Sequence, residues 1–296
     1  MGEIEYLPTN IPEEPKNVGQ DGGFGLRDFL DRALQSGRVR YVGFSFHDTP
    51  ETWREVVDYY DWSFCQHVCN YYDVTFQAGM YGIRQAALMD YGFVAMEPLL
   101  GGVLANQLPK ETQEVFAATG IRRSPAGWAL RWVWNQPEVS LLLSGMGTQA
   151  QVEENIQLAR DSDIPMTAEE VAAVNKVRAI LKGKGPIPCT GCGKCSCPKG
   201  VAIQMCFECY NANNTFRLSS IGHHNYGQSI KPTLRAASNC DGCNQCAGQC
   251  PEGLNIPREL KRVADYFASA TDSWLGRCTL CSPSIYGPFP KTGLCV

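Results

Sequence analysis

The sequence lacks three features that mark common classes of protein. It has no basic excess, because 26 Lys and Arg stand against 30 Asp and Glu and give a net charge of -4, so charge gives no reason to expect nucleic acid or an anionic membrane as a partner. No stretch approaches the roughly 20 apolar residues that cross a bilayer. The N-terminal stretch MGEIEYLPTNIPEEPK lacks the charged and then apolar layout of a signal peptide. We therefore expect a cytoplasmic protein.

Cysteine is scarce in the first 188 residues, where only Cys65 and Cys69 occur. The other thirteen of the 15 cysteines lie between Cys189 and Cys295. In a reducing cytoplasm such a density indicates metal ligands rather than disulfides. The composition changes in a short Gly- and Pro-rich linker, which we take as a domain boundary. The predicted organisation is an irregular tail, a first domain, the linker and a second domain, over residues 1–24, 25–182, 183–188 and 189–296.

Short apolar runs alternate with helical patterns in the first domain. The runs have the length and flanks of buried parallel strands, and they cover residues 39–45, 64–70, 93–98 and 139–145. Helix start signals stand between them, at Asp48 before Pro50, at Ser124 before Pro125, and at Thr167 with Glu170. Gly37 and Gly92 stand where helices are expected to end. This order predicts an α/β fold with a parallel sheet, and a complete (β/α)8 barrel would need about 250 residues.

A run of cysteines in the second domain carries the most specific pattern. It follows the C-x2-C-x2-C-x3-C-P spacing of bacterial ferredoxins and consists of Cys240, Cys243, Cys246 and Cys250, followed by Pro251. In such runs three cysteines bind one [4Fe-4S] cluster and the fourth binds another. A second run must therefore supply the remaining ligands.

The second run is found about fifty residues earlier in the chain, at Cys189, Cys192, Cys195 and Cys197, followed by Pro198. We therefore predict two [4Fe-4S] clusters, each with three ligands from one run and the fourth from the other. The first cluster is assigned to Cys189, Cys192, Cys195 and Cys250. The second cluster is assigned to Cys240, Cys243, Cys246 and Cys197.

Several stretches of the chain resemble one known family. SGRVRYVGFSFHD, FCQHVCNYYD, VAMEPLLGGVLA, ALRWVWNQPEVSLLLSGM and QVEENI look like, in this order, the second half of an aldo-keto reductase barrel. IPCTGCGKC is similar to the linker of the branch that carries a C-terminal ferredoxin-like domain. The resemblance covers residues 25 to about 265. It implies an α/β fold that is the C-terminal half of a (β/α)8 TIM barrel, with strands five to eight, followed by a small ferredoxin-like domain of helices and loops with two clusters.

The resemblance also implies a reaction. Family members pass hydride from NADPH to a carbonyl, while a tyrosine helped by a lysine, an aspartate and a histidine acts as general acid. Those four residues come from strands one to four, and no position of this sequence matches them; Tyr6 stands in a Pro-rich tail. The catalytic residues are therefore unknown. We expect an oxidoreductase that a missing N-terminal half or a partner completes.

The nucleotide half of the family site is better represented. By resemblance, Ser45 and Gln66 contact the nicotinamide carboxamide, and Phe46 replaces the usual asparagine. Met96 stands where an aromatic ring stacks on the nicotinamide. The positions matching the pyrophosphate and adenosine loops are Leu99, Gly101, Ser144, Gly145, Glu154 and Asn155. A glycine-containing turn before a helix can present free N-H groups to phosphate, so NAD(P)H is a possible cofactor; the alternative is that Ser45 and Gln66 only satisfy backbone groups at strand ends.

Other cysteines and two histidines leave alternatives open. Related reductases place two residues between the third and fourth cysteines of the first run, whereas only Ser196 stands there in this chain. The pairs Cys206 with Cys209 and Cys278 with Cys281 can supply a substitute ligand or a zinc site. His47 can face the mouth of the barrel, whereas His67 is expected to pack. Cys65 and Cys69 share a strand face and are expected to be buried.

Two functions are compatible with these patterns. In the first, the chain is an iron-sulfur oxidoreductase of the aldo-keto reductase type, with two clusters that exchange electrons with a redox partner. In the second, it is a stand-alone electron-transfer or interaction protein, and the half-barrel is a scaffold. A half-barrel exposes unpaired strand edges, so self-association through the open edge is the other expected partnership.

Overall fold

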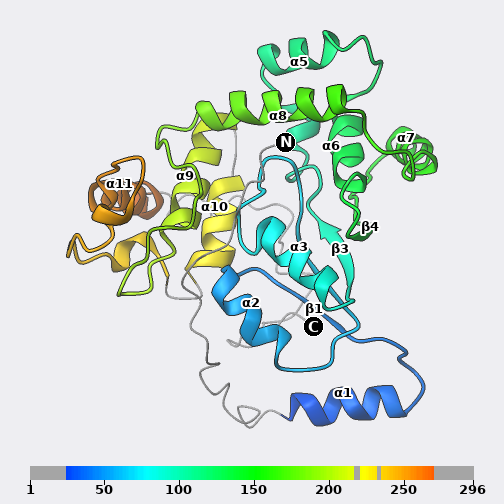
Figure 1. Cartoon of the computed structure of the whole chain (residues 1–296), viewed down its shortest axis with the longest axis horizontal. Helices are drawn as coiled ribbons and strands as arrows, with labels where there is room; N and C mark the ends of the chain where they lie inside the picture. Colours follow the sequence, from blue (N-terminus) through cyan, green and yellow to red (C-terminus); the bar gives the residue numbers. More distant parts are fainter. Residues whose placement is uncertain (1–24, 217–220, 232–234, 270–296) are drawn as a thin grey trace.

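The computed structural model describes residues 25–216, 221–231 and 235–269 (Figure 1). Tyr6 and the cysteines Cys278, Cys281 and Cys295 lie outside these residues, so the predictions made for them keep that status. Within the described ranges, no helix combines the length and the apolar character needed to cross a membrane.

Four parallel strands form one sheet in the order β1-β2-β3-β4. Their bounds are β1 Gly43–Ser45, β2 Phe64–Val68, β3 Gly92–Met96 and β4 Val139–Leu142. Sequential parallel strands need a crossover between each pair, and helices supply it. The α/β fold with a parallel sheet is therefore confirmed. The first strand is shorter than predicted, because β2 begins at Phe64 and pairs with β1 only from Gly43 onward.

Eight helices follow or connect these strands in the first part of the chain. They are α1 Leu26–Gln35, α2 Pro50–Val57, α3 Gly79–Leu88, α4 Val103–Asn106, α5 Lys110–Ala117, α6 Pro125–Trp134, α7 Gln149–Arg160 and α8 Ala168–Gly183. The cysteine-rich part holds α9 Ile203–Phe216, α10 Ile221–Asn225, the π-helical turn η1 Tyr226–Ile230, the 3-10 turns η2 Ala237–Asn239 and η3 Ala247–Gln249, and α11 Ile256–Ser269. In Figure 1 this second group lies beside the sheet, on the side away from α7.

Most of the helix signals act as predicted. The Ser124 hydroxyl accepts a hydrogen bond from the Gly127 N-H at the start of α6, and Thr167 and Glu170 form a capping box at the start of α8. The prediction for Gly92 was wrong, because this residue begins β3. Asp90 takes the left-handed conformation after α3 instead, with φ of 58°; aspartate tolerates it because its short polar side chain bonds locally.

Two large hydrophobic cores hold the molecule together. One surrounds the sheet and includes Trp53, Phe93 and Trp128, and the other lies around α9 and α11. The two parts exchange side chains: Phe216 of α9 packs into the sheet core, and Phe76, from the loop after β2, packs into the second core. Burying one such side chain stabilises the fold by about 1.5–3 kcal/mol. The cysteine-rich part is therefore fixed against the loop that follows β2.

Candidate functional site

An open groove lies at the carboxyl ends of β3 and β4. Its volume of about 870 Å³ is within the range of small-molecule sites. Seven of the nine predicted nucleotide-binding residues line it, namely Met96, Leu99, Gly101, Ser144, Gly145, Glu154 and Asn155. The structure therefore brings together residues that the sequence places as far apart as β3 and α7.

Hydrogen bonds fix the far wall of the groove. The Asn155 amide donates to the Ser144 hydroxyl at 2.9 Å, and the Ser124 hydroxyl donates to the Glu154 carboxylate. Ser124 also caps α6, so α6 and α7 meet at this wall. The opposite wall contains three consecutive left-handed residues, Leu100, Gly101 and Gly102. Leu100 is not a glycine, and such conformations persist where the surrounding structure enforces them.

In the turn that begins α7, side-chain oxygens already accept hydrogen bonds from several backbone N-H groups. Thr148 and Gln151 form a capping box, and the Gln151 side-chain oxygen also accepts from the Gly147 N-H at 2.8 Å. Gly145, at the mouth of this turn, has open space where a Cβ would stand. The sequence pattern predicted free N-H groups here. A phosphate at this turn would have to share these amides with Gln151 or bind nearer to Gly145.

Ser45 and Gln66 do not line the groove. They are paired across β1 and β2, and the Gln66 amide donates to the Ser45 hydroxyl at 2.5 Å. Phe46, which stands where the family has asparagine, is 3% exposed and meets the Trp53 ring edge-on at 5.0 Å. The two predicted carboxamide contacts therefore satisfy each other in this structure, and Phe46 belongs to the core.

The two histidines after the strands differ in environment. His67 is fully buried between Trp53 and Phe93, with ring centres 5.3 and 4.7 Å away. Burial lowers the pKa of His67 to about 4, so the ring is neutral. His47 follows β1 and is exposed as a whole residue. Partial burial of its ring lowers its pKa, and the negative charge of Glu97 opposes that effect.

Two residues near His47 carry no sequence signal. Gln77 bonds with His47, and its amide donates to the Ser229 hydroxyl at 3.0 Å. Gln77 and Glu97 both adopt left-handed backbone conformations, with φ of 55° and 49°. Non-glycine residues of this kind gather at functional sites, but their backbone angles cannot be read from residue type.

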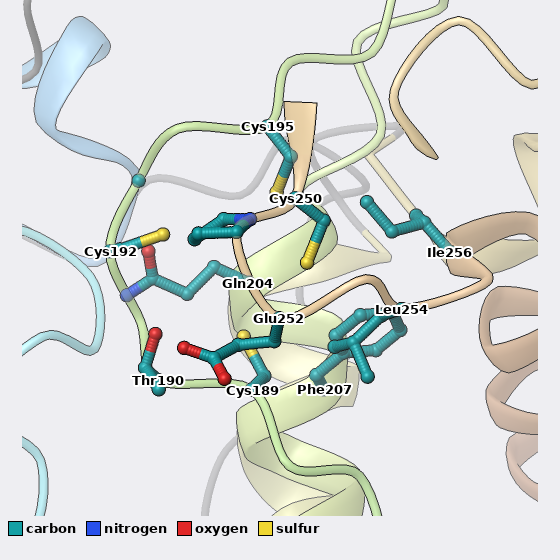
Figure 2. A pocket seen from close by; sticks show the side chains of 12 residues that line it. Cys189, Thr190, Cys192, Cys195, Gln204, Phe207, Cys250, Glu252, Leu254 and Ile256 are labelled. Atoms are coloured by element: carbon teal, nitrogen blue, oxygen red, sulfur yellow. The ribbon is translucent and has the colours of Figure 1, made fainter. Parts of the chain in front are cut away.

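A second pocket collects cysteines from both runs (Figure 2). Its lining includes the four residues assigned to the first cluster, Cys189, Cys192, Cys195 and Cys250. Figure 2 shows their sulfur atoms turned toward a common space, beside the apolar side chains of Phe207, Leu254 and Ile256. The four cysteines come together because the loop before α9 and the turn before α11 both line this pocket. The volume of this pocket is about 20 Å³.

The thiols of each predicted set influence one another. Burial, with a smaller effect of neighbouring thiols that include Cys192, raises the pKa of Cys189 to about 12 and that of Cys195 to about 11. Cys250 of the same set and Cys246 of the other set are both among the neighbours of Cys195. Burial also raises the pKa of Cys246, and its thiol neighbours are the other three members of the second set, Cys197, Cys240 and Cys243.

The cysteines in the described ranges form no disulfide with one another. The twelve that the structure describes are all free thiols. Within the described ranges, no three His, Cys, Asp or Glu side chains are close enough to hold a metal ion. Cys206 and Cys209 lie buried in α9, and Cys65 and Cys69 lie buried in the sheet core. None of these four shares the lining of the cysteine pocket.

The two cysteine runs have left-handed residues at the same two positions. Gly191 and Gly242, each two residues after the first cysteine, are left-handed with φ of 71° and 75°. Gly193 and Asn244, each just after the second cysteine, have φ of 68° and 66°.

Each run also ends in the same turn. The Gly200 N-H donates to the Cys197 carbonyl at 2.9 Å, and the Gly253 N-H donates to the Cys250 carbonyl at 3.1 Å. The two runs are joined directly, because the Ser196 N-H donates to the side-chain oxygen of Gln249 at 2.8 Å. The short spacing around Ser196 therefore leaves the Cys-Pro turn of the first run intact.

A parallel sheet with crossing helices and a groove at its carboxyl ends defines an α/β protein, a class whose ligand sites commonly lie at that edge. The family model described as aldo/keto reductase family matches residues 24–179, more than half of the chain. The chain belongs to this family. No curated protein matches it.

Solved structures of the same family resemble part of the chain. The holo form of an aldo-keto reductase from Bacillus halodurans has 17% identity and a TM-score of 0.42 over 51% of this chain and 54% of its own. An aldo-keto reductase from Klebsiella pneumoniae in complex with NADPH has 20% identity and a TM-score of 0.41 over 51% of this chain and 52% of its own. The chain thus spans about half the length of these relatives.

Proposed function

We propose that the chain is an iron-sulfur oxidoreductase of the aldo-keto reductase type, from the branch with a C-terminal ferredoxin-like domain. It would hold two [4Fe-4S] clusters and a nicotinamide nucleotide, and exchange electrons with a redox partner. The observation that supports this proposal is the pair of cysteine runs with left-handed residues at matching positions, together with the pocket that Cys189, Cys192, Cys195 and Cys250 line.

The residues present fit such clusters. Thiolates are the usual ligands of [4Fe-4S] clusters, and Cys189, Cys192, Cys195 and Cys250 surround one partly apolar pocket. Each iron of a cubane takes its own thiolate, so a cluster needs its four ligands around one common space. When bound, the clusters supply one-electron transfer. The left-handed glycines let the loop backbones turn between ligands.

The groove supports the nucleotide part of the proposal. Ser144, Glu154 and Asn155 form a hydrogen-bonded wall, and Leu99 and Gly101 form the opposite one. A reduced nicotinamide nucleotide would supply hydride chemistry there. The acid that protonates the carbonyl oxygen in the family has no matching residue in this sequence, so complete carbonyl reduction requires residues from another segment or partner.

The alternative is a stand-alone electron-transfer or interaction protein. One observation favours it: the Ser45 hydroxyl and the Gln66 amide bond to each other at 2.5 Å and lie outside the groove lining. If the nicotinamide carboxamide finds no hydrogen-bond partner, the groove does not bind the nucleotide, and the sheet serves only as a scaffold. Binding of NADPH to the purified chain, followed by nicotinamide fluorescence, separates the two readings.

The clusters are tested by anaerobic reconstitution with iron and sulfide. We expect about eight irons and about eight sulfides per chain, as two cubanes require. Cys250→Ser should lose about half of both, because it removes one ligand of one cluster. Lys194→Ala, an exposed change inside the same loop, is the matched control and should keep both. Binding of zinc without sulfide, in amounts that Cys250→Ser does not alter, would refute the cluster assignment.

A further inference from the structure

Three carboxylates meet where the cysteine-rich part packs against the sheet. Asp73 follows β2, Glu97 follows β3, and Glu208 lies on α9. Asp73 and Glu208 are 4% and 8% exposed, and each of the three side chains keeps one buried oxygen without a hydrogen-bond partner. Glu97 and Glu208 both repel a negative charge on Asp73. For Asp73, which also accepts a side-chain hydrogen bond from Asn70, burial and this repulsion favour the protonated form.

The charges around Asp73 do not balance. The titratable groups that face it are Glu208 and Cys209 from α9, Glu97 from the end of β3, Lys182 from α8 and Tyr72 from its own loop. Lys182 is the only cation among them, and its ammonium lies 3.9 Å from the centre of the Tyr72 ring. One ammonium cannot neutralise three carboxylates. Burial, more than repulsion, raises the pKa of Asp73 to about 7.

The carboxylates also stand between the two pockets. Glu97 lines the nucleotide groove. On the other side, the Glu208 carboxylate accepts from the Thr75 hydroxyl at 2.6 Å. Gln204, which donates to the Thr75 carbonyl at 2.7 Å, lines the cysteine pocket (Figure 2). Asp73 interacts with both Glu97 and Glu208, so a charge added in either pocket acts on its proton.

We propose that Asp73 is a buried proton-binding site shared by the nucleotide groove and the cysteine pocket. Its carboxylate takes up one proton from solvent when negative charge arrives in a pocket and releases that proton when the charge leaves. For the cysteine pocket, one electron comes from a one-electron donor and one proton from solvent, so the net charge of the buried region is unchanged. This last part rests on the proposed function, whereas the proton site does not.

The proton site is tested on the full chain without added iron. The infrared spectrum at about pH 6 should show the carbonyl band of a protonated carboxylic acid, and Asp73→Asn should remove it. In urea unfolding, the wild-type unfolding constant should rise relative to that of Asp73→Asn, by up to about tenfold per pH unit between about pH 5 and about pH 7, because the unfolded aspartate has already lost its proton there.

Asp163→Asn, at an exposed position, is the control and should keep both the infrared band and the pH dependence of the wild type. A chain without the band, or an Asp73→Asn variant with the same pH dependence as the wild type, overturns the proton site. Glu97→Gln should lower the proton affinity of Asp73 by removing its repulsion, which gives a second test if Asp73→Asn does not fold.

The redox coupling is tested on reconstituted protein. The midpoint potential of the cluster should fall as pH rises through about 7 in the wild type and be independent of pH in Asp73→Asn. A pH-independent wild-type potential overturns the coupling. If no cluster assembles, the proposed function fails instead, and the infrared and unfolding results still decide whether Asp73 holds a proton.

Discussion

Two features favour glycine at position 191, namely its left-handed backbone angle and the close approach of Thr75. Its φ is 71°, and a Cβ there would stand 2.8 Å from the Thr75 hydroxyl. Gly193 has a similar φ of 68° but open space around it. We expect Gly193→Ala to reduce the free energy of unfolding by about 1–2 kcal/mol through backbone strain alone, and Gly191→Ala to reduce it further. Urea unfolding measures both, and equal losses would show that the contact with Thr75 is unimportant.

His67 makes stability depend on acid. Its pKa is lowered to about 4 in the fold, whereas an unfolded histidine titrates near 6.5. As pH falls from about 6.5 to about 4, the unfolded state gains a proton that the native state does not, so stability drops by up to about 3 kcal/mol. We expect His67→Gln to show a smaller drop in urea unfolding over this range. An unchanged slope would mean that another group titrates.

At the residue scale, the spacing of the cysteines could be interpreted from the sequence, whereas the burial of single polar residues could not. The C-x2-C-x2-C-x3-C-P pattern predicts that Cys250 joins the first run, because the fourth cysteine of such a run binds the other cluster, and Cys250 lines the same pocket as Cys189, Cys192 and Cys195. Nothing local distinguishes Asp73 from an exposed aspartate, since its burial comes from α8 and α9, more than a hundred residues later. The left-handed Glu97 was equally unpredictable, because that conformation is set by the turn it enters.

One side chain at the start of helix α6 contributes both to the stability of the fold and to the wall of the groove. Ser124 caps the helix and also bonds Glu154 on α7. We expect Ser124→Ala to lower the free energy of unfolding by about 1 kcal/mol and to weaken NADPH binding, because Glu154 loses its anchor. Thr167→Ala removes the comparable cap of α8, away from the groove lining. It should cost similar stability in urea unfolding and leave the fluorescence titration with NADPH unchanged.

Equal NADPH affinity in wild type and Ser124→Ala would show that the helix cap at Ser124 does not contribute to nucleotide binding.

At the scale of helices and strands, the sequence predicted where the elements lie better than where they end. Pro50, Ser124 and the Thr167 box set helix starts locally, through caps and fixed φ. Strand ends depend on partners, so β1 is confined to the residues that pair with β2.

The part of the molecule that the structure describes contains two large hydrophobic cores that share side chains. Phe76 and Phe216 cross between them, and the buried carboxylates lie in the same region as Thr75 and Gln204. The change in composition predicted a boundary between two domains, but it could not predict this contact. Interfaces between distant segments depend on three-dimensional packing, for which residue order alone gives no period or spacing.

The edge of the sheet carries the last prediction. Among the described residues β4 pairs only with β3, and Leu141 on β4 is 53% exposed. An open, apolar edge is a template for pairing with another chain, so we expect the isolated chain to self-associate. Leu141→Lys should reduce the average mass in sedimentation, because a lysine on an edge strand opposes such pairing.

Leu88→Lys, at the end of α3 and 79% exposed, adds the same charge at another exposed apolar position. It should leave the average mass in sedimentation as high as in the wild type. If both variants reduce association equally, added charge rather than the β4 edge is responsible. If the wild type is monomeric at every concentration, this edge does not pair with a second copy, and the redox partner or a further segment becomes the remaining candidate to cover it.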